Sequence, residues 1–206
     1  MSVANHSALI VVDVQRDFCP GGSLAVPDGD TIIPVVQTLI DIFVRHNLPV
    51  AMTRDHHPPH HISFQAQGGP WPPHCIPGTT GFDYHPQLSI PPQAAHFIKG
   101  FQPDQDAYSG FAGQRIGDGG ELNGETLDQW FQAHAVDTLY VVGLATDYCV
   151  RETALDARRL GYTVYLPRNG VRGVDVAHGD SQQALDEMSR HGVRVVDAIA
   201  LEPPFH

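Results

Sequence analysis

The segment at residues 140–153 constrains the fold of this chain more than any other stretch. It opens with a short apolar run rich in β-branched residues, typical of a buried strand, and Gly143 interrupts that run. From Cys149 onward the apolar residues recur at helical spacing, at Val150, Ala154, Leu155 and Ala157. The sequence therefore places Cys149 where a strand ends and a helix begins.

Five further apolar runs predict strands, and helical stripes separate most of them. The nearly continuous run at residues 8–14 is typical of a central parallel strand. The other strands are expected at residues 50–53, 94–98, 163–166 and 193–196, and helices at residues 31–43, 126–134, 149–160 and 178–191. This alternation predicts a three-layer α/β/α protein, with helices on both faces of a six-stranded, mainly parallel sheet. We expect one domain spanning residues 1–206.

Charge and cysteine content restrict the partners and the compartment. The 206 residues carry a formal net charge of -11, which argues against binding to nucleic acid or to an anionic membrane. We find no apolar run of membrane-spanning length and no signal-peptide pattern. The three cysteines, Cys19, Cys75 and Cys149, are too few for a disulfide framework, so we expect a reducing compartment, the cytoplasm.

Three chemically different polar side chains fall at the carboxyl ends of predicted strands: Asp13, Lys99 and Cys149. Open parallel sheets bind their ligands outside these strand ends. The three groups supply what a thiol needs to attack an amide, namely a base, a positive charge and a nucleophile. The backbone N–H groups of Ala145 and Cys149, at the start of the helix, could hold the oxyanion.

Each of these residues also has a purely structural interpretation. The N–H groups and dipole of a helix start lower a thiol pKa, which favours a reactive Cys149. A lone buried cysteine, however, is often an inert core residue. Asp13 could be a turn aspartate, and Lys99 by itself a solvated lysine at a strand end. Their convergence on one rim favours catalysis, because packing does not explain polar groups of such different kinds there.

Histidines gather in the long irregular segment at residues 54–92, which we interpret as a metal-binding loop and a candidate lid. Asp55 and His57 are two residues apart in extended chain, so their side chains point the same way, whereas His56 points away. With His61 and His74 they offer a donor set that suits zinc, iron or manganese. The alternative is a solvent-exposed, His-rich loop with incidental metal affinity.

Two aromatic side chains, Phe18 and Trp71, lie on loops near Asp13 and His74. Aromatic rings on loops can sandwich a flat ligand. The alternative is that they only anchor their loops. The sequence contains neither a Gly-x-Ser-x-Gly elbow nor a Gly-rich phosphate loop, so serine-hydrolase and nucleotide-binding interpretations have no support.

Several segments carry motifs of one known family. The Cys-bearing segment 143–150 is widespread in that family's superfamily, whereas the Asp55-x-His57 pair and the segment 71–75 are more specific. Further matching segments are residues 8–15, 17–19, 21–26 and 108–111. On these motifs the chain resembles, nearly end to end, the nicotinamidase/pyrazinamidase family of isochorismatase-like cysteine hydrolases. The resemblance implies the isochorismatase-like hydrolase fold, with strand order 321456.

The resemblance also implies a catalytic role for each residue on the rim. Asp13, Lys99 and Cys149 would form the catalytic triad. The amides of Ala145 and Cys149 would form the oxyanion hole, next to a cis Leu144–Ala145 peptide bond. The substrate would be bound by Phe18, Trp71 and Ala145, with the two aromatic rings flanking a pyridine.

A metal site follows from the same resemblance. One divalent ion (Zn, Fe or Mn) would be held by Asp55, His57 and His74 and would bind the ring nitrogen of the substrate. His61 aligns with a direct ligand in some members only. The chain departs from the family at His56, where many members carry an aromatic residue, which leaves the exact ligand set open.

The implied reaction is hydrolysis of nicotinamide to nicotinate and ammonia through a cysteine thioester, with pyrazinamide as a second substrate and NAD salvage as the setting. One rival is another cysteine hydrolase of the superfamily, acting on an N-carbamoyl or ureide substrate; such relatives lack the metal cluster. The other rival is a non-enzymatic metal-binding or scaffold protein. Both a monomer and a homo-oligomer are compatible with the sequence.

Overall fold

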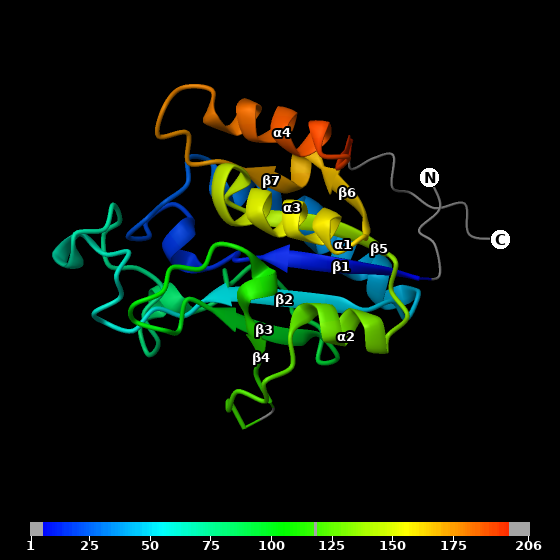
Figure 1. Ribbon diagram of the computed structural model, residues 1–206, viewed down its shortest axis with the longest axis horizontal. Helices are drawn as coiled ribbons and strands as arrows, with labels where there is room; N and C mark the ends of the chain where they lie inside the picture. Colours follow the sequence, from blue (N-terminus) through cyan, green and yellow to red (C-terminus); the bar gives the residue numbers. More distant parts are fainter. Residues whose placement is uncertain (1–5, 118, 198–206) are drawn as a thin grey trace.

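A central, mainly parallel β-sheet organises the computed structural model, which describes residues 6–117 and 119–197 (Figure 1). The strand order is β4-β3-β2-β1-β5-β6-β8, and β7 pairs with β5 off this path. The strands are β1 (Ser7–Val12), β2 (Val50–Asp55), β3 (Ala95–Lys99), β4 (Gln114–Arg115), β5 (Thr138–Leu144), β6 (Thr163–Pro167), β7 (Val171–Arg172) and β8 (Arg194–Val196).

The predicted strand order is confirmed. The six expected strands correspond to β3, β2, β1, β5, β6 and β8, which lie in that order across the sheet. The structure adds two strands of two residues each, β4 and β7. β4 runs antiparallel to β3 at the sheet edge, and β7 extends the pairing of β5. Strands this short show no periodicity, so the sequence pattern does not reveal them.

Helices cover both faces of the sheet, as predicted. The long helix α1 (Ile33–Arg45) packs on one face, and three helices pack on the other: α2 (Leu127–Ala133), α3 (Arg151–Arg159) and α4 (Asp180–Arg190). A short 3₁₀ turn, Gly29–Ile32, occupies the start of the predicted first helix, and the α-helix begins after it with a proline in its first turn. Proline is favoured there because the first helical N–H groups have no partner within the helix.

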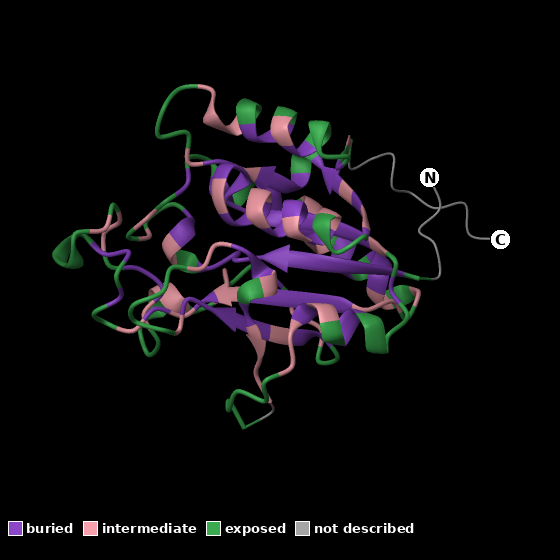
Figure 2. Ribbon diagram, viewed as in Figure 1, coloured by how far each residue is buried: buried purple, intermediate pink, exposed green. Residues whose placement is uncertain are grey.

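The central strand β1 divides the core into two halves. Leu9 and Val11 face the α1 side, and Ala8, Ile10 and Val12 face the side of α2, α3 and α4. All five are fully buried, and Figure 2 shows β1 buried along its length. A strand buried on both faces has no polar face, which explains the continuous apolar run in the sequence.

Most of the segment at residues 54–92 lies beyond the carboxyl end of β2, at the cyan end of the molecule in Figure 1. Its last part returns along the α1 side of the sheet, where Leu88 packs in the core and the Ser89 N–H bonds to Gln37 of α1. This segment is anchored internally, because the Phe64 side chain is buried and the Phe64 backbone pairs with that of Trp71 in an isolated β-bridge.

Among residues 6–117 and 119–197, none of the helices has the length and apolar character of a membrane span.

Gly143 allows β5 to approach β1 closely beside the site described below. It pairs with Val12, and a Cβ atom at this position would lie 2.0 Å from the Val12 carbonyl oxygen. Its φ is also +122°, which residues with a side chain rarely adopt. A glycine is therefore required here on two independent grounds.

We expect Gly143→Ala to lower the free energy of unfolding by more than Gly161→Ala does. Gly161 has a φ of +97° but open space around its Cβ position, so it isolates the conformational cost, about 1–3 kcal/mol. Urea denaturation of both variants measures the difference. Equal losses would contradict a close contact between the backbones of β1 and β5.

Candidate active site

Three side chains from separate strands meet at the carboxyl edge of the sheet. Asp13 follows β1, Lys99 ends β3, and Cys149 follows β5. The Lys99 Nζ lies 2.9 Å from Asp13 Oδ2 and 3.3 Å from Cys149 Sγ. The three residues that sequence reasoning placed on one rim thus form one contiguous cluster, and all three are buried.

Lys99 is the charged centre of this cluster. Burial disfavours its ammonium form, but the carboxylates of Asp13 and Asp55 and the neighbouring Cys149 outweigh that effect and raise the Lys99 pKa well above its usual value. The Nζ also donates to the Ala107 carbonyl oxygen at 3.2 Å. Lys99 is therefore a permanent cation in the site.

Asp13 lies in the turn by which the chain leaves β1, at a φ of +48°. Burial raises the pKa of its carboxyl group, Lys99 opposes the rise, and Asp55 adds to it. The Thr53 hydroxyl donates to Asp13 Oδ1 at 2.6 Å. Asp13 Oδ2 faces the Lys99 ammonium at 2.9 Å, so the two carboxylate oxygens are held by different partners.

Cys149 lies in a π-helical turn, Thr146–Val150, that joins β5 to α3. The sequence predicted a thiol pKa lowered by a helix start and by Lys99. Instead, burial raises the pKa of Cys149 well above its usual value; Lys99 opposes the rise, whereas Asp55 and Asp13 add to it. The prediction was wrong because it left out desolvation and the two carboxylates. The resting group is a neutral thiol that must pass its proton to a base.

The backbone before Cys149 has an unusual form. The Leu144–Ala145 peptide bond is cis, as the family resemblance implied. The Ala145 carbonyl oxygen accepts hydrogen bonds from the N–H groups of Tyr148 and Val150, both at 3.1 Å. Ala145 and Cys149 both line the same pocket.

Asp55, His57 and His74 form a compact group of candidate metal ligands. Each offers one ligand atom, these atoms all lie within 4.8 Å of one another, and the three residues are buried. The Nδ1 atoms of His57 and His74 lie 3.0 Å and 2.8 Å from the carbonyl oxygens of Gly100 and Pro72. A carbonyl oxygen only accepts, so each Nδ1 carries a proton, and each Nε2 is the ring nitrogen left for a metal, as in metal-binding histidines.

The two other candidate ligands stand outside this group. The Nε2 of His61 lies 3.1 Å from the Gln105 carbonyl oxygen and therefore donates, while its Nδ1 lies 2.7 Å from the Ser63 hydroxyl. Its ring instead packs against His57, with centroids 4.1 Å apart. His56 packs edge-on against Phe82, at 5.4 Å. Neither side chain completes the ligand set in this arrangement.

Asp55 belongs to both clusters. One carboxylate oxygen contacts the Lys99 ammonium, and the other lies 3.5 Å from His57 Nε2. Burial opposes the charged form of Asp55, but Lys99 and His57 outweigh it and hold the pKa of this carboxyl group far below its usual range. Asp55 is thus an anion that connects the triad with the metal-ligand group.

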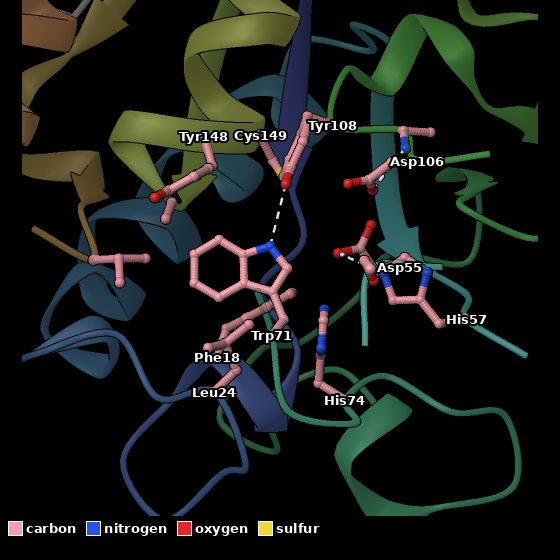
Figure 3. A pocket seen from close by; sticks show the side chains of 14 residues that line it. Phe18, Leu24, Asp55, His57, Trp71, His74, Asp106, Tyr108, Tyr148 and Cys149 are labelled. Carbon is pink, nitrogen blue, oxygen red and sulfur yellow. Dashed lines mark hydrogen bonds and ion pairs between the residues drawn. The ribbon is translucent and has the colours of Figure 1, made fainter. Parts of the chain in front are cut away.

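Aromatic side chains form the walls of the pocket in front of Cys149 (Figure 3). Phe18 packs against the His74 ring at 5.6 Å, and Trp71 meets Tyr148 edge-on at 5.1 Å. The Trp71 Nε1 donates to the Tyr108 hydroxyl at 3.1 Å. Burial raises the pKa of Tyr108 to about 12, so this hydroxyl stays neutral. The result is a pocket with aromatic walls, which suits a flat ring.

Several residues of the site carried no role in the sequence-based interpretation. Thr53 bonds to Asp13, and the pocket is also lined by Leu24, Asp106, Tyr108, Tyr148 and Val174. Thr53 had a usable signal, because it is a polar residue at the end of a predicted strand, as Asp13 is. Val174 had none, because its position depends on contacts between distant segments.

Comparison with known proteins assigns the family. The model of the isochorismatase domain matches residues 7–200, and the chain belongs to this family. The nicotinamidase of Escherichia coli (strain K12) is 42% identical over 200 residues, which cover 90% of this chain and 92% of that protein.

Two solved structures agree with this assignment. Pyrazinamidase of Pyrococcus horikoshii, in complex with zinc, has a TM-score of 0.83 at 43% identity, covering 93% of this chain and 99% of that one. PnC1 from L. infantum, in complex with nicotinate, has a TM-score of 0.85 at 31% identity, covering 98% of both chains. These relatives, one of them named a nicotinamidase and one a pyrazinamidase, match the chain over nearly its whole length.

We expect Thr53→Val to destabilise the protein by about 1.5–3 kcal/mol, because it removes a hydrogen bond to a buried carboxylate. Thr138→Val is the matched control, since the Thr138 hydroxyl makes the same type of bond to Asp137 at an exposed position. Urea denaturation gives both values. A Thr53→Val variant as stable as Thr138→Val would show that Asp13 does not depend on this bond.

Proposed function

We propose that this protein hydrolyses nicotinamide to nicotinate and ammonia, with pyrazinamide as a second substrate. The observation that carries the proposal is the position of the Lys99 ammonium, 2.9 Å from the Asp13 carboxylate and 3.3 Å from the Cys149 sulfur, at one end of the aromatic pocket. The similarity to a nicotinamidase and to a pyrazinamidase supports the same reaction.

The pocket fits a flat, neutral substrate. Phe18 and Trp71 would lie against the two faces of the pyridine ring, and Ala145 would line the end where the carboxamide lies. Asp55, His57 and His74 fit a divalent ion, zinc, iron or manganese, because they offer one carboxylate and two imidazole Nε2 atoms. When bound, such an ion would fix the ring nitrogen and so orient the carboxamide toward Cys149.

Acylation begins with proton transfer. Asp13 takes the proton of the Cys149 thiol, and its raised pKa makes it a stronger base than an ordinary aspartate. The Lys99 cation stabilises the thiolate that forms. The sulfur adds to the carboxamide carbon, and the backbone N–H groups of Ala145 and Cys149 hold the oxyanion. The C–N bond then breaks as Asp13 returns the proton to the leaving nitrogen, which releases ammonia and leaves a thioester.

Deacylation reuses the same groups. Asp13 removes a proton from a water molecule, whose oxygen adds to the thioester carbon. The tetrahedral intermediate is held by the same two amides, and the C–S bond breaks. The leaving sulfur regains its proton from Asp13, the carboxyl group of the product loses its remaining proton to solvent, and nicotinate departs. The reaction would belong to NAD salvage in the cytoplasm.

The rival functions have less support from the geometry. Cysteine hydrolases acting on N-carbamoyl or ureide substrates would not need the Asp55, His57 and His74 group, which is assembled here with its outer hydrogen bonds in place. A metal-binding scaffold would not need Asp13 and Lys99 buried against Cys149, because burying charged groups is costly unless function retains them.

We expect Cys149→Ala to reduce ammonia release from nicotinamide by at least about a thousandfold, because no other group can form the thioester. Cys19→Ala is the matched control: Cys19 is also a buried free cysteine, but it stands outside the triad. A coupled ammonia assay measures both. Near wild-type turnover by Cys149→Ala would rule out the thioester mechanism.

We also expect chelator treatment to lower the activity and added divalent metal to restore it. Among variants, His74→Ala should lose bound metal, whereas His56→Ala should keep it, because the His56 ring packs against Phe82 instead of joining the ligand group. Elemental analysis of the purified variants gives the metal content. Loss of metal from His56→Ala with retention by His74→Ala would require a different ligand set.

A further inference from the structure

The end of strand β2 lacks a backbone neighbour on one side. β1 pairs with β2 only as far as Val11 opposite Met52, and the chain then turns away at Asp13. β2 continues to Asp55, whose other neighbour, β3, ends at Lys99. The N–H and C=O groups of Asp55 face the β1 side, but β1 no longer pairs with β2 at this level, so the strand offers them no backbone partner.

The side-chain amide of Gln15 takes the place of the missing strand. Its Nε2 donates to the Asp55 carbonyl oxygen at 3.0 Å, and its Oε1 accepts from the Asp55 N–H at 2.8 Å. The primary amide thus reproduces the donor and acceptor of a peptide group. Nε2 also donates to the Phe82 carbonyl oxygen at 3.0 Å, and the Gln15 side chain is fully buried.

We propose that Gln15 is a positioning residue that fixes Asp55 and thereby sets the affinity of the metal site. This inference rests on the proposed function, which makes Asp55 a metal ligand. Gln15 binds both backbone groups of Asp55 and so fixes the position of its Cα atom. From there the Asp55 side chain must contact Lys99 with one oxygen and the metal-ligand group with the other.

No shorter or apolar side chain can replace this contact. Asparagine lacks one methylene group and does not reach both backbone groups of Asp55. Methionine fills a similar volume but leaves the buried N–H and C=O groups of Asp55 and the part-buried Phe82 carbonyl oxygen without these bonds, which is costly. A glutamate carboxylate keeps the acceptor for the Asp55 N–H but faces the carbonyl oxygens of Asp55 and Phe82 without a proton to donate.

The chain contains a matched control for this amide clamp. Gln37 Oε1 accepts from the Ser89 N–H at 2.8 Å, and its Nε2 lies 3.4 Å from the Ser89 carbonyl oxygen. The same residue type thus holds both backbone groups of one residue, at an exposed position outside the pocket. Gln37→Met removes this longer clamp, together with the bond from Gln37 Nε2 to Asp41 Oδ1 at 2.8 Å, without touching Asp55.

The test compares Gln15→Met, Gln15→Glu and Gln37→Met with the wild type. Apparent Zn²⁺ affinity is measured by competition with a fluorescent chelator, at a temperature where circular dichroism shows each variant folded. We expect both Gln15 variants to bind Zn²⁺ roughly tenfold to a hundredfold more weakly, as for other residues that orient metal ligands, and Gln37→Met to bind as the wild type does. Saturating Zn²⁺ should restore part of the lost ammonia release, which a damaged fold would not allow.

Each outcome decides the matter. Folded Gln15 variants with wild-type Zn²⁺ affinity would overturn the inference while leaving the proposed function intact. Failure of both Gln15 variants to fold would assign Gln15 to the fold as a whole and would equally overturn a positioning role. Wild-type protein that binds no metal, or releases no ammonia from nicotinamide, would instead overturn the proposed function on which the inference rests.

Discussion

The ion cluster around the buried Lys99 ammonium is the interaction on which the site depends. A cation without solvent is tolerated only if carboxylates surround it, and Asp13 and Asp55 both contact its Nζ. Removing either carboxylate would leave an uncompensated buried charge. The proposed catalytic triad and the proposed metal-ligand group therefore cannot be treated as independent parts, because Asp55 contacts both Lys99 and His57.

This charge arrangement also determines how the nucleophile works. The carboxylates of Asp13 and Asp55 near Cys149 disfavour a third anion, so a resting thiolate is disfavoured despite the neighbouring lysine. A neutral Cys149 thiol is compatible with the site. The thiolate can form if a neighbouring carboxylate is neutralised at the same time. Transfer to Asp13 does this, since it removes one anion as the other forms. Burial and the Asp55 carboxylate raise the pKa of both Asp13 and Cys149, and both raised values favour proton transfer from the thiol to Asp13.

The sequence predicts what depends on local patterns and fails where contacts between distant segments decide. Apolar runs and helical spacing predicted the six main strands. The ends of these strands placed Asp13, Lys99 and Cys149 on one rim, because parallel strands bring the side chains at their carboxyl ends together. Sequence reasoning missed β4 and β7, which exist only through pairing with longer strands. It also gave the wrong direction for the Cys149 pKa, because desolvation and Asp55 come from the assembled fold. The role of Gln15 was hidden for the same reason: nothing local shows that its amide replaces a strand.

The turn after β1 shows how much of the site one short segment controls. Asp13 is the proposed base, and Gln15 holds the backbone of Asp55. The Asp17 carboxylate accepts the N–H of Cys75 at 2.7 Å and that of Ser23 at 3.1 Å, which ties the residue after His74 to the loop that follows Phe18. Residues 13–18 therefore connect the proposed base, the proposed metal ligands and the aromatic wall of the pocket formed by Phe18. Substitutions in this segment change shared contacts, so their effects on activity should not add as those of distant sites do.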